Sequence, residues 1–307
     1  GGDGYSKKDG LQVTRWREDA LKGNYGMFVF LRNLNTKRLW SSTFEPLGGR
    51  PDGYMVVFSQ DRAEYYRTDD NIDTHSEIVV TTEDNAEIRR ISLTNHGSEP
   101  AVVELTSYLE PVLAPQSADE AHPAYSNLFI RTELVSQYDS IIASRRPREI
   151  GKSSLWAVHT VTVEGETAGS LQYETIRGNF IGRGRDITNP AGLSQPLTNT
   201  VGIVLDPIMC LRRRVRVEPG KIVKVSFMTG LADSRDDAVT LAAKYHNPHS
   251  IDRAFDLALT RSRVETTYLN LRAGEIKTYQ NMISQIIYLS PARRKHRDII
   301  AGNTKGQ

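Results

Sequence analysis

The chain has 307 residues and a formal net charge of +2 at pH 7, with 38% hydrophobic and 25% charged residues. This composition is typical of a folded protein and excludes extensive disorder, and a net charge so close to zero gives no reason to expect nucleic acid as a partner. The length allows one large domain and a smaller element. The single cysteine, Cys210, excludes an internal disulfide, which suits a reducing compartment. It lies beside Met209 and Leu211, so we expect a small buried residue rather than a nucleophile.

The first three-quarters of the chain, from about Met27 to Leu231, carries a β-strand pattern. Residues 27–31 and 54–59 are short runs rich in aromatic and β-branched side chains. Residues 102–109 and 155–163 alternate with period two, which places successive side chains on opposite faces of a sheet. Many such runs with almost no helical pattern between them predict a large antiparallel β-sandwich over residues 1–232.

Two irregular points in this region lead to more specific expectations. The apolar phase changes at Arg89-Arg90, which predicts a β-bulge there. Glu218-Pro219-Gly220 separates two strand patterns, which predicts a hairpin.

Beyond residue 232 the pattern becomes helical. Ser234 with Asp237 forms a capping-box sequence, and apolar residues then recur with helical spacing up to Tyr245. A second helix is predicted from Ser250, after an interruption at Pro248. A third helix over residues 276–287 has an apolar stripe that needs a partner surface, either the sandwich or a domain further along the polypeptide. We therefore expect residues 233–307 to form a short helical linker region.

Motifs of the common catalytic centres are absent from the sequence. It contains no Gly-x-Ser-x-Gly elbow, no His-Glu-x-x-His and no phosphate-binding loop of the Gly-x4-Gly-Lys-Ser/Thr type. The seven histidines do not cluster, so no metal site is expected. Gly182-Arg183-Gly184 is too short for a dinucleotide-binding fingerprint. It predicts a loop that exposes Arg183 and Arg185, either as solvated side chains or as a contact for glycan or a neighbouring module.

The densest polar and aromatic segment lies near the N-terminus. Sugars are bound by aromatic faces and by side chains that hydrogen-bond to hydroxyl groups. The candidate glycan contacts by this criterion are Tyr5, Arg15, Trp16, Arg17, Glu18 and Asp19. Glu18 and Asp19 are adjacent and would point in opposite directions in a strand, which makes them a poor acid–base pair across one glycosidic bond. In the alternative, Arg17 pairs with one of these carboxylates in a structural network and Trp16 packs in the core.

Several stretches of the sequence together resemble the large sandwich domain of the cellobiose phosphorylase family (glycosyltransferase 36-like). The similarity is greatest to the phosphorylase-like region of bacterial cyclic β-1,2-glucan synthases. It covers nearly the whole chain and depends on the order and spacing of the stretches. These are Gly4-Tyr5-Ser6, residues 13–19, Phe30-Leu31-Arg32-Asn33, Trp40-Ser41, residues 58–64, residues 122–129, residues 180–185 and Asp206-Pro207-Ile208.

The resemblance implies a galactose mutarotase-like supersandwich that leads toward an (α/α)6 barrel. In the phosphorylases that barrel holds the general acid and the phosphate site. The chain opens on Gly1 without Met, so we expect a segment of a longer enzyme, with the catalytic acid beyond Gln307 and no catalytic residue in this segment.

For the parent protein, the resemblance implies a synthase that makes cyclic glucan from UDP-glucose with a divalent metal, at the cytoplasmic face of the inner membrane. This segment would need no cofactor and would contact glucan and neighbouring modules. Two alternatives stay open: the N-terminal half of a disaccharide or oligosaccharide phosphorylase, and a free-standing carbohydrate-binding module.

Overall fold

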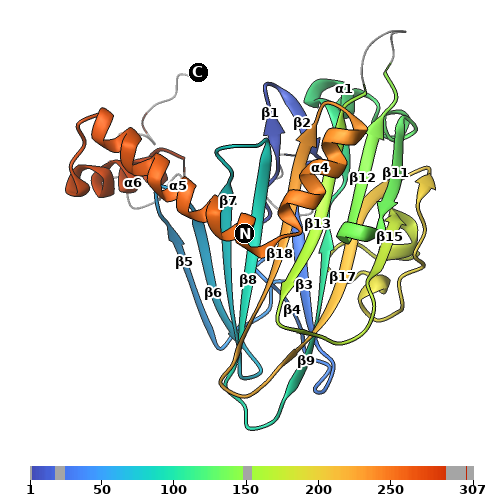
Figure 1. Cartoon of the computed structure of the whole chain (residues 1–307), viewed down its shortest axis with the longest axis horizontal. Helices are drawn as coiled ribbons and strands as arrows, with labels where there is room; N and C mark the ends of the chain where they lie inside the picture. Colours follow the sequence, from blue (N-terminus) through green and yellow to red (C-terminus); the bar gives the residue numbers. More distant parts are fainter. Residues whose placement is uncertain (1, 18–24, 148–153, 288–301, 303–307) are drawn as a thin grey trace. The chain divides into compact units, whose positions relative to one another are not determined.

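The computed structural model describes residues 2–17, 25–147, 154–287 and 302, and its strands form three antiparallel sheets. The large sheet has nine strands, whose central members lie side by side in Figure 1. Its order is β16 (Gly202–Ile203), β11 (Ile130–Val135), β12 (Ser140–Arg145), β13 (Trp156–Glu164), β18 (Ile222–Ala232), β8 (Ala86–Asn95), β7 (Ile72–Val80), β6 (Ala63–Asp69) and β5 (Gly53–Phe58). The predicted antiparallel β-sandwich is confirmed.

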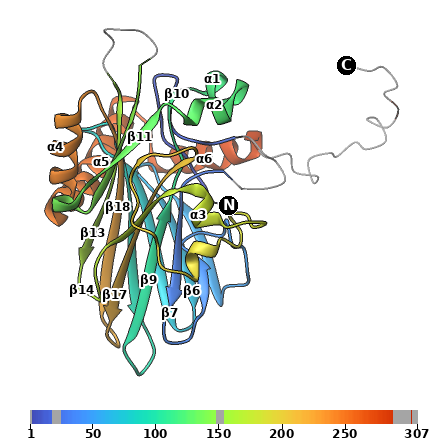
Figure 2. The same cartoon turned by 90° about the vertical axis from the view of Figure 1, so that its right-hand side faces the viewer.

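The two smaller sheets complete the β region. The six-stranded sheet contains β14 (Glu166–Thr167), β17 (Pro207–Val217), β9 (Ala101–Tyr108), β3 (Phe28–Asn33) and β4 (Leu39–Ser41), with β15 (Gln172–Ile176) also paired to β17. The three-stranded sheet contains β1 (Lys7–Lys8), β2 (Leu11–Thr14) and β10 (Pro111–Pro115). Two short helices, α1 (Gln116–Ala121) and α2 (Pro123–Asn127), follow β10, and Figure 2 shows them beside that strand.

The main core lies between the large and the six-stranded sheets. The large sheet contributes side chains such as Ile91 and Val225, and the six-stranded sheet contributes Leu31, Leu105 and Leu211, all almost fully buried. The period-two pattern of the sequence therefore corresponds to an inner and an outer face on each strand.

The outer faces of both sheets are covered as well. On the large sheet, α4 (Arg235–Tyr245) lies along β13 and β18 (Figure 1), and its apolar side chains pack on Ile88, Val158 and Met228. Gly230 allows this approach, because a Cβ there would lie 2.6 Å from Leu241 Cδ2. On the six-stranded sheet, Phe30 and Cys210 are covered by residues of α3 (Arg177–Ile181) and η2 (Ala191–Leu193). The interpretation of Cys210 as a buried residue is confirmed, and burial raises the pKa of its thiol.

The bulge predicted at Arg89-Arg90 is wrong. β8 pairs in continuous register with β7 and β18 through both arginines. The apolar phase changes because the two faces of β8 are covered over different lengths. Ile88 faces α4 and α5, whereas Ile91 faces the sandwich core. A strand whose outer face is covered by helices shows the same change of apolar phase as a strand with a bulge, so the sequence pattern alone does not distinguish the two.

The hairpin predicted around Pro219 is also wrong. A turn does occur there, but β17 and β18 belong to different sheets, so the chain crosses from one sheet to the other. The turn between β8 and β9 makes a second crossing at the same end. Asn95 links the two, because its side-chain amide donates to the carbonyl oxygens of Glu99 and Val217, at 2.8 and 3.0 Å.

The helices after the sandwich agree with the sequence pattern, except that one of them begins two residues earlier than predicted. Ser234 caps α4 by accepting the Asp237 N–H at 3.1 Å, as predicted. α5 (Pro248–Tyr268) begins at Pro248 rather than at Ser250, with the Asn247 side chain accepting the His249 N–H. Proline suits a first helical turn because no intrahelical partner exists for an N–H there. α6 (Ala273–Ile287) corresponds to the third predicted helix.

The chain forms two compact units, Gly1–Leu259 and Thr260–Gln307. The first unit contains the sandwich together with α4 and the first part of α5, which the sequence pattern assigns to the linker. In the second unit, the described side chains Tyr279, Met282, Ile283 and Ile286 on α6 are exposed. No helix in the described part of the chain is long and apolar enough to span a membrane.

Candidate functional site

The N-terminal segment folds back over one end of the large sheet and is held there by a buried arginine. Arg89 donates to the Met27 carbonyl at 2.7 Å and to the Asp3 carbonyl at 3.3 Å. Gly4 has a φ of +61°, and a Cβ on it would lie 2.7 Å from the Arg89 guanidinium. Both observations favour glycine at this position. Two residues further on, Ser6 donates its N–H to Thr14 Oγ1 at 2.8 Å, which ties the segment to β2.

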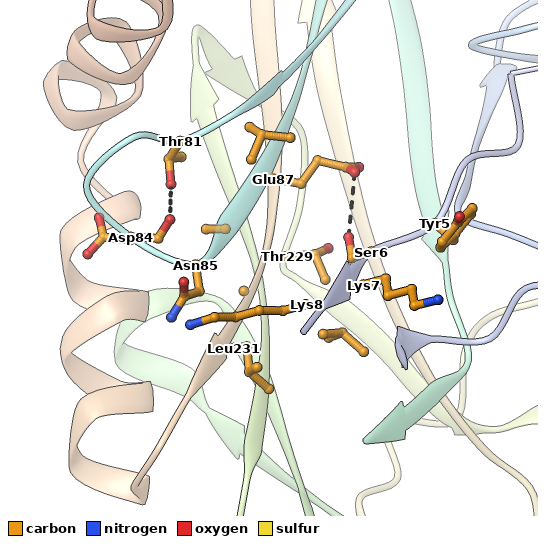
Figure 3. Close-up of a pocket in the computed structure, with 14 residues that line it drawn as sticks. Tyr5, Ser6, Lys7, Lys8, Thr81, Asp84, Asn85, Glu87, Thr229 and Leu231 are labelled. Atoms are coloured by element: carbon orange, nitrogen blue, oxygen red, sulfur yellow. Dashed lines mark hydrogen bonds between the residues drawn. The ribbon is translucent and has the colours of Figure 1, made fainter. Parts of the chain in front are cut away.

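This arrangement creates a hollow of about 250 Å³ between the N-terminal segment and the ends of β7, β8 and β18 (Figure 3). Its wall combines one aromatic ring, aliphatic side chains and several polar groups. The lining residues are Tyr5, Ser6, Lys7, Lys8, Val13, Val80, Thr81, Asp84, Asn85, Ala86, Glu87, Thr229, Gly230 and Leu231. Of the predicted glycan contacts that the structure describes, only Tyr5 belongs to this lining.

Tyr5 is held by a second aromatic residue. Its ring stacks on Trp16 with centroids 4.8 Å apart and planes 22° apart, and 40% of Tyr5 is exposed. Trp16 is only partly buried and belongs to none of the core clusters described above. The alternative that Trp16 packs in the core is therefore wrong. Trp16 backs the ring of Tyr5, and this fixes the orientation of an aromatic side chain at the hollow.

The carboxylates of the hollow have partners already. Asp84 accepts hydrogen bonds from Lys244 Nζ at 2.6 Å and from the Tyr245 hydroxyl at 2.7 Å. Glu87 accepts from Arg89 Nε at 2.7 Å, and Ser6 Oγ lies 3.5 Å from its second oxygen (Figure 3). Each carboxylate is thus oriented by a cation and keeps remaining lone pairs that can accept a hydroxyl group.

Arg15 is not available as a glycan contact, because it is 5% exposed. Its guanidinium donates twice to Asp119, at 2.8 and 2.9 Å, once to Glu110 at 2.6 Å, and once to the side chain of Asn127 at 2.6 Å. The prediction for this residue is corrected: Arg15 anchors β2 to β10, α1 and α2.

The network around Arg15 extends to the surface. Glu110 also accepts from the Tyr108 hydroxyl and from Arg177, and Asn127 donates to Asp206 at 2.8 Å. Burial acts to raise the pKa of Glu110, but Arg15 and Arg177 outweigh it and hold that pKa below its usual value. Burial, followed by the charge of Glu110, raises the pKa of Asp206. Three separate stretches that carry the family resemblance, around residues 15, 127 and 206, therefore meet in one network.

The remaining candidates divide into two groups. Arg17 places its guanidinium carbon 5.2 Å from the centroid of the Tyr25 ring, and its Nε is buried without a hydrogen-bond partner among the described residues. Glu18 and Asp19 lie outside the described residues. Arg183 and Arg185 are exposed on the loop after α3, as predicted, and neither lines the hollow.

One group of described side chains has the spacing of metal ligands. Donor atoms of Glu64, His75 and Glu77 lie within 4.8 Å of one another on the outer face of β6 and β7. Both oxygens of Glu77 are bonded to arginines, Arg62 at 2.8 Å and Arg90 at 2.9 Å. These cations already supply the positive charge that a metal would bring, so the group is an ion-pair network.

The residues missed by sequence analysis come from the turn between β7 and β8 and from the end of β18. Asp84, Asn85, Glu87 and Thr229 are polar residues of ordinary turn and strand ends, and nothing in their spacing marks them as neighbours of Tyr5. They become neighbours of Tyr5 because residues 2–14 fold back over this end of the sheet.

Known proteins give this geometry a context. Residues 1–248 match the family described as "Glycosyl hydrolase 94, supersandwich domain". The chain is 36% identical over 289 residues to the cyclic beta-(1,2)-glucan synthase NdvB of Rhizobium meliloti, covering 94% of this chain and 10% of that protein. It is 23% identical to solabiose phosphorylase of Paenibacillus borealis, covering 87% of this chain and 34% of that protein. It therefore spans from a tenth to a third of the length of these relatives.

Solved structures are more distant. A putative kojibiose phosphorylase from human microbiome has a TM-score of 0.44 at 7% identity, covering 81% of this chain and 28% of that one. A bacterial glucoamylase complexed with acarbose has a TM-score of 0.45 at 9% identity, and the match covers 82% of this chain and 34% of the glucoamylase chain. The match over residues 1–248 takes in the whole sandwich and α4. The chain belongs to the glycosyl hydrolase 94 supersandwich domain family.

Proposed function

We propose that this chain is a glycan-contacting sandwich module of a cyclic β-1,2-glucan synthase, and that it acts without a catalytic residue of its own. The observation that carries the proposal is the hollow beside Tyr5. It offers a stacked aromatic ring together with hydroxyl, amide and carboxylate groups, as sugar binding requires. The 36% identity to a synthase supports the choice of parent protein.

The charges in the hollow support a binding role rather than catalysis. A general acid needs a carboxyl group that keeps its proton near neutral pH, usually through burial without a cationic partner. Asp84 and Glu87 instead each have a cationic partner, Lys244 and Arg89. Carboxylates held in these ion pairs still have oxygen lone pairs that can accept hydrogen bonds from hydroxyl groups.

The rest of the proposal concerns the parent protein. There, glucose would come from UDP-glucose at a metal-assisted site outside this chain, on the cytoplasmic side of an inner membrane. This module would hold glucan while neighbouring modules act on it. The exposed apolar residues of α6 support contact with such a module, because a stripe of this kind is usually covered by a partner.

A second candidate is the N-terminal part of a glycoside phosphorylase, which the similarity to solabiose phosphorylase supports. The sequence downstream of Gln307 separates the two. A complete barrel with an acidic catalytic residue favours a phosphorylase, whereas a truncated barrel followed by a second sandwich favours a synthase.

The test is calorimetric titration of the chain with linear β-1,2-gluco-oligosaccharides. Tyr5→Ala should weaken binding about tenfold, or about 1.4 kcal/mol, because the aromatic face is lost. Tyr125→Ala is the matched control, since Tyr125 is 56% exposed on α2 and does not line the hollow. Thermal unfolding should show that both variants keep the fold. Equal affinity in the two variants, or no binding by the unsubstituted chain, contradicts the proposed glycan contact.

The absence of catalysis is tested separately. The chain is incubated with the same oligosaccharides and inorganic phosphate, and glucose 1-phosphate is measured. Release of glucose 1-phosphate by this chain, and its loss in a carboxylate variant such as Glu87→Gln, would overturn the non-catalytic role.

A further inference from the structure

A second hollow, of about 280 Å³, lies next to the first one on the side of α4. It is lined by the turn after β7, the end of β18 and the exposed side of α4. Its residues are Glu83, Asp84, Asn85, Leu231, Ala232, Asp233, Asp237, Thr240, Leu241 and Lys244. Asp84, Asn85 and Leu231 belong to both hollows, so the two are adjacent.

The boundary between the hollows is a fixed part of the fold. The Leu231 N–H donates to the Asn85 carbonyl at 2.9 Å, which joins the β7–β8 turn to the end of β18. Figure 3 shows Asn85 and Leu231 between α4 and the N-terminal segment that carries Tyr5. A ligand that occupies both hollows must therefore pass over Asn85 and Leu231.

The second hollow differs from the first in chemistry. None of the described residues that line it is aromatic, and it is rich in groups that can bond to hydroxyls, among them Asp233, Thr240 and Asn85. Four of its lining residues are acidic and one, Lys244, is basic. Lys244 is already bonded to Asp84 and Glu83. This surplus of negative charge disfavours phosphate and carboxylate ligands and suits a neutral, hydroxyl-rich one.

The volumes limit the size of what each hollow holds. Pockets that enclose a whole drug-sized ligand begin at about 300 Å³. Each hollow is slightly smaller than that, so each has room for about one sugar ring. Two neighbouring hollows of this size, one with an aromatic platform and one with polar acceptors, match two consecutive rings of an oligosaccharide.

We propose that the two hollows are consecutive subsites for a neutral, linear gluco-oligosaccharide of at least two rings. One ring lies against Tyr5, the next bonds to the Asp233 and Thr240 side, and the glycosidic linkage crosses Asn85 and Leu231. This inference rests on the proposed glycan contact and adds the length and the charge of the ligand.

The experiment is a comparison of affinity with chain length, using glucose, the β-1,2-linked disaccharide and the trisaccharide. For the unsubstituted chain, affinity should rise at least tenfold from glucose to the disaccharide. The double variant Asp233→Asn, Thr240→Val should abolish that rise and leave glucose binding unchanged, because the first hollow is intact. The matched control Asp52→Asn, Thr188→Val changes exposed residues outside both hollows and should keep the rise.

The outcomes separate the two proposals. If glucose and the disaccharide bind with equal affinity and Tyr5→Ala weakens both, the glycan contact stands and the second subsite is overturned. A rise with chain length that survives the double variant also overturns the second subsite. If none of the three sugars binds, the proposed function itself fails.

Discussion

Burial decides what the polar side chains of this molecule do, and Arg15 and Tyr5 are the contrasting cases. They lie ten positions apart in one N-terminal segment, and both are residue types that bind sugars. Arg15 is 5% exposed and holds two buried carboxylates, whereas Tyr5 is 40% exposed at the edge of a hollow. Residue type alone therefore does not show whether a polar or aromatic side chain is buried in the structure or exposed to a ligand.

We expect Arg15→Ala to lower the free energy of unfolding by about 3–5 kcal/mol, because the buried carboxylate of Asp119 would lose its cationic partner and Glu110 would keep only Arg177 as a cation. Urea denaturation at pH 7 measures the change. Arg183→Ala is the matched control, since that exposed side chain should contribute within about 0.5 kcal/mol. A loss of less than about 1 kcal/mol in Arg15→Ala would mean that the network is not a structural anchor.

His159 is a second buried polar residue and gives a prediction of pH dependence. It lies between the sheets, with Ser107 Oγ 2.8 Å from Nε2 and Thr229 Oγ1 2.9 Å from Nδ1. Both ring nitrogens of this core histidine therefore have a hydroxyl partner. Burial lowers its pKa to about 3, so the folded protein resists protonation of the ring down to that pH.

Between pH 6.5 and about 3, the unfolded chain therefore binds a proton that the folded chain excludes. Stability from His159 is complete above pH 6.5 and decreases as the pH falls, by about 1.4 kcal/mol per pH unit. Urea denaturation from pH 7 to pH 5 measures this slope. His159→Gln should reduce the slope by that amount, and an unchanged slope would show that another group accounts for the acid sensitivity.

At the scale of elements, β8 presents arginine side chains on both faces of the large sheet. Arg89 points inward and holds the N-terminal segment, whereas Arg90 points outward, where it lies 3.9 Å from the centroid of the Phe255 ring and is bonded to Asp252 on α5. Two adjacent arginines thus connect the strand to two separate parts of the chain. A period-two pattern predicts that neighbouring residues face opposite ways, but it does not reveal what covers each face.

At the scale of the whole molecule, the sandwich is completed by helices that follow it in the chain. Leu241, Tyr245 and Phe255 belong to the cluster that covers the outer face of the large sheet, and all three are buried. The first compact unit accordingly ends at Leu259 and not at residue 232. The helices α4 and the first part of α5 are therefore structural parts of the sandwich unit.

This predicts different outcomes for two truncated chains. A chain that ends at residue 232 exposes Ile88, Val158 and Met228, each of which contributes about 1.5–3 kcal/mol when buried. It should aggregate or unfold well below the full chain, with increased binding of a hydrophobic dye. A chain that ends at residue 259 should retain one cooperative transition close to that of the full chain. Equal melting temperatures for the two truncated chains would contradict the role of α4 and α5.

The sequence by itself determined the β-sandwich, the change to helices after residue 231, the cap at Ser234 and the family, because these depend on local periodicity, local hydrogen bonds and the order of motifs. Only the tertiary structure decided that Arg15 is buried, that Pro219 marks a crossing between sheets, and that Tyr5 faces residues near positions 85 and 230. Those features depend on contacts between residues 80 to more than 200 positions apart. The local periodicity of a sequence does not indicate which distant segment covers a given face.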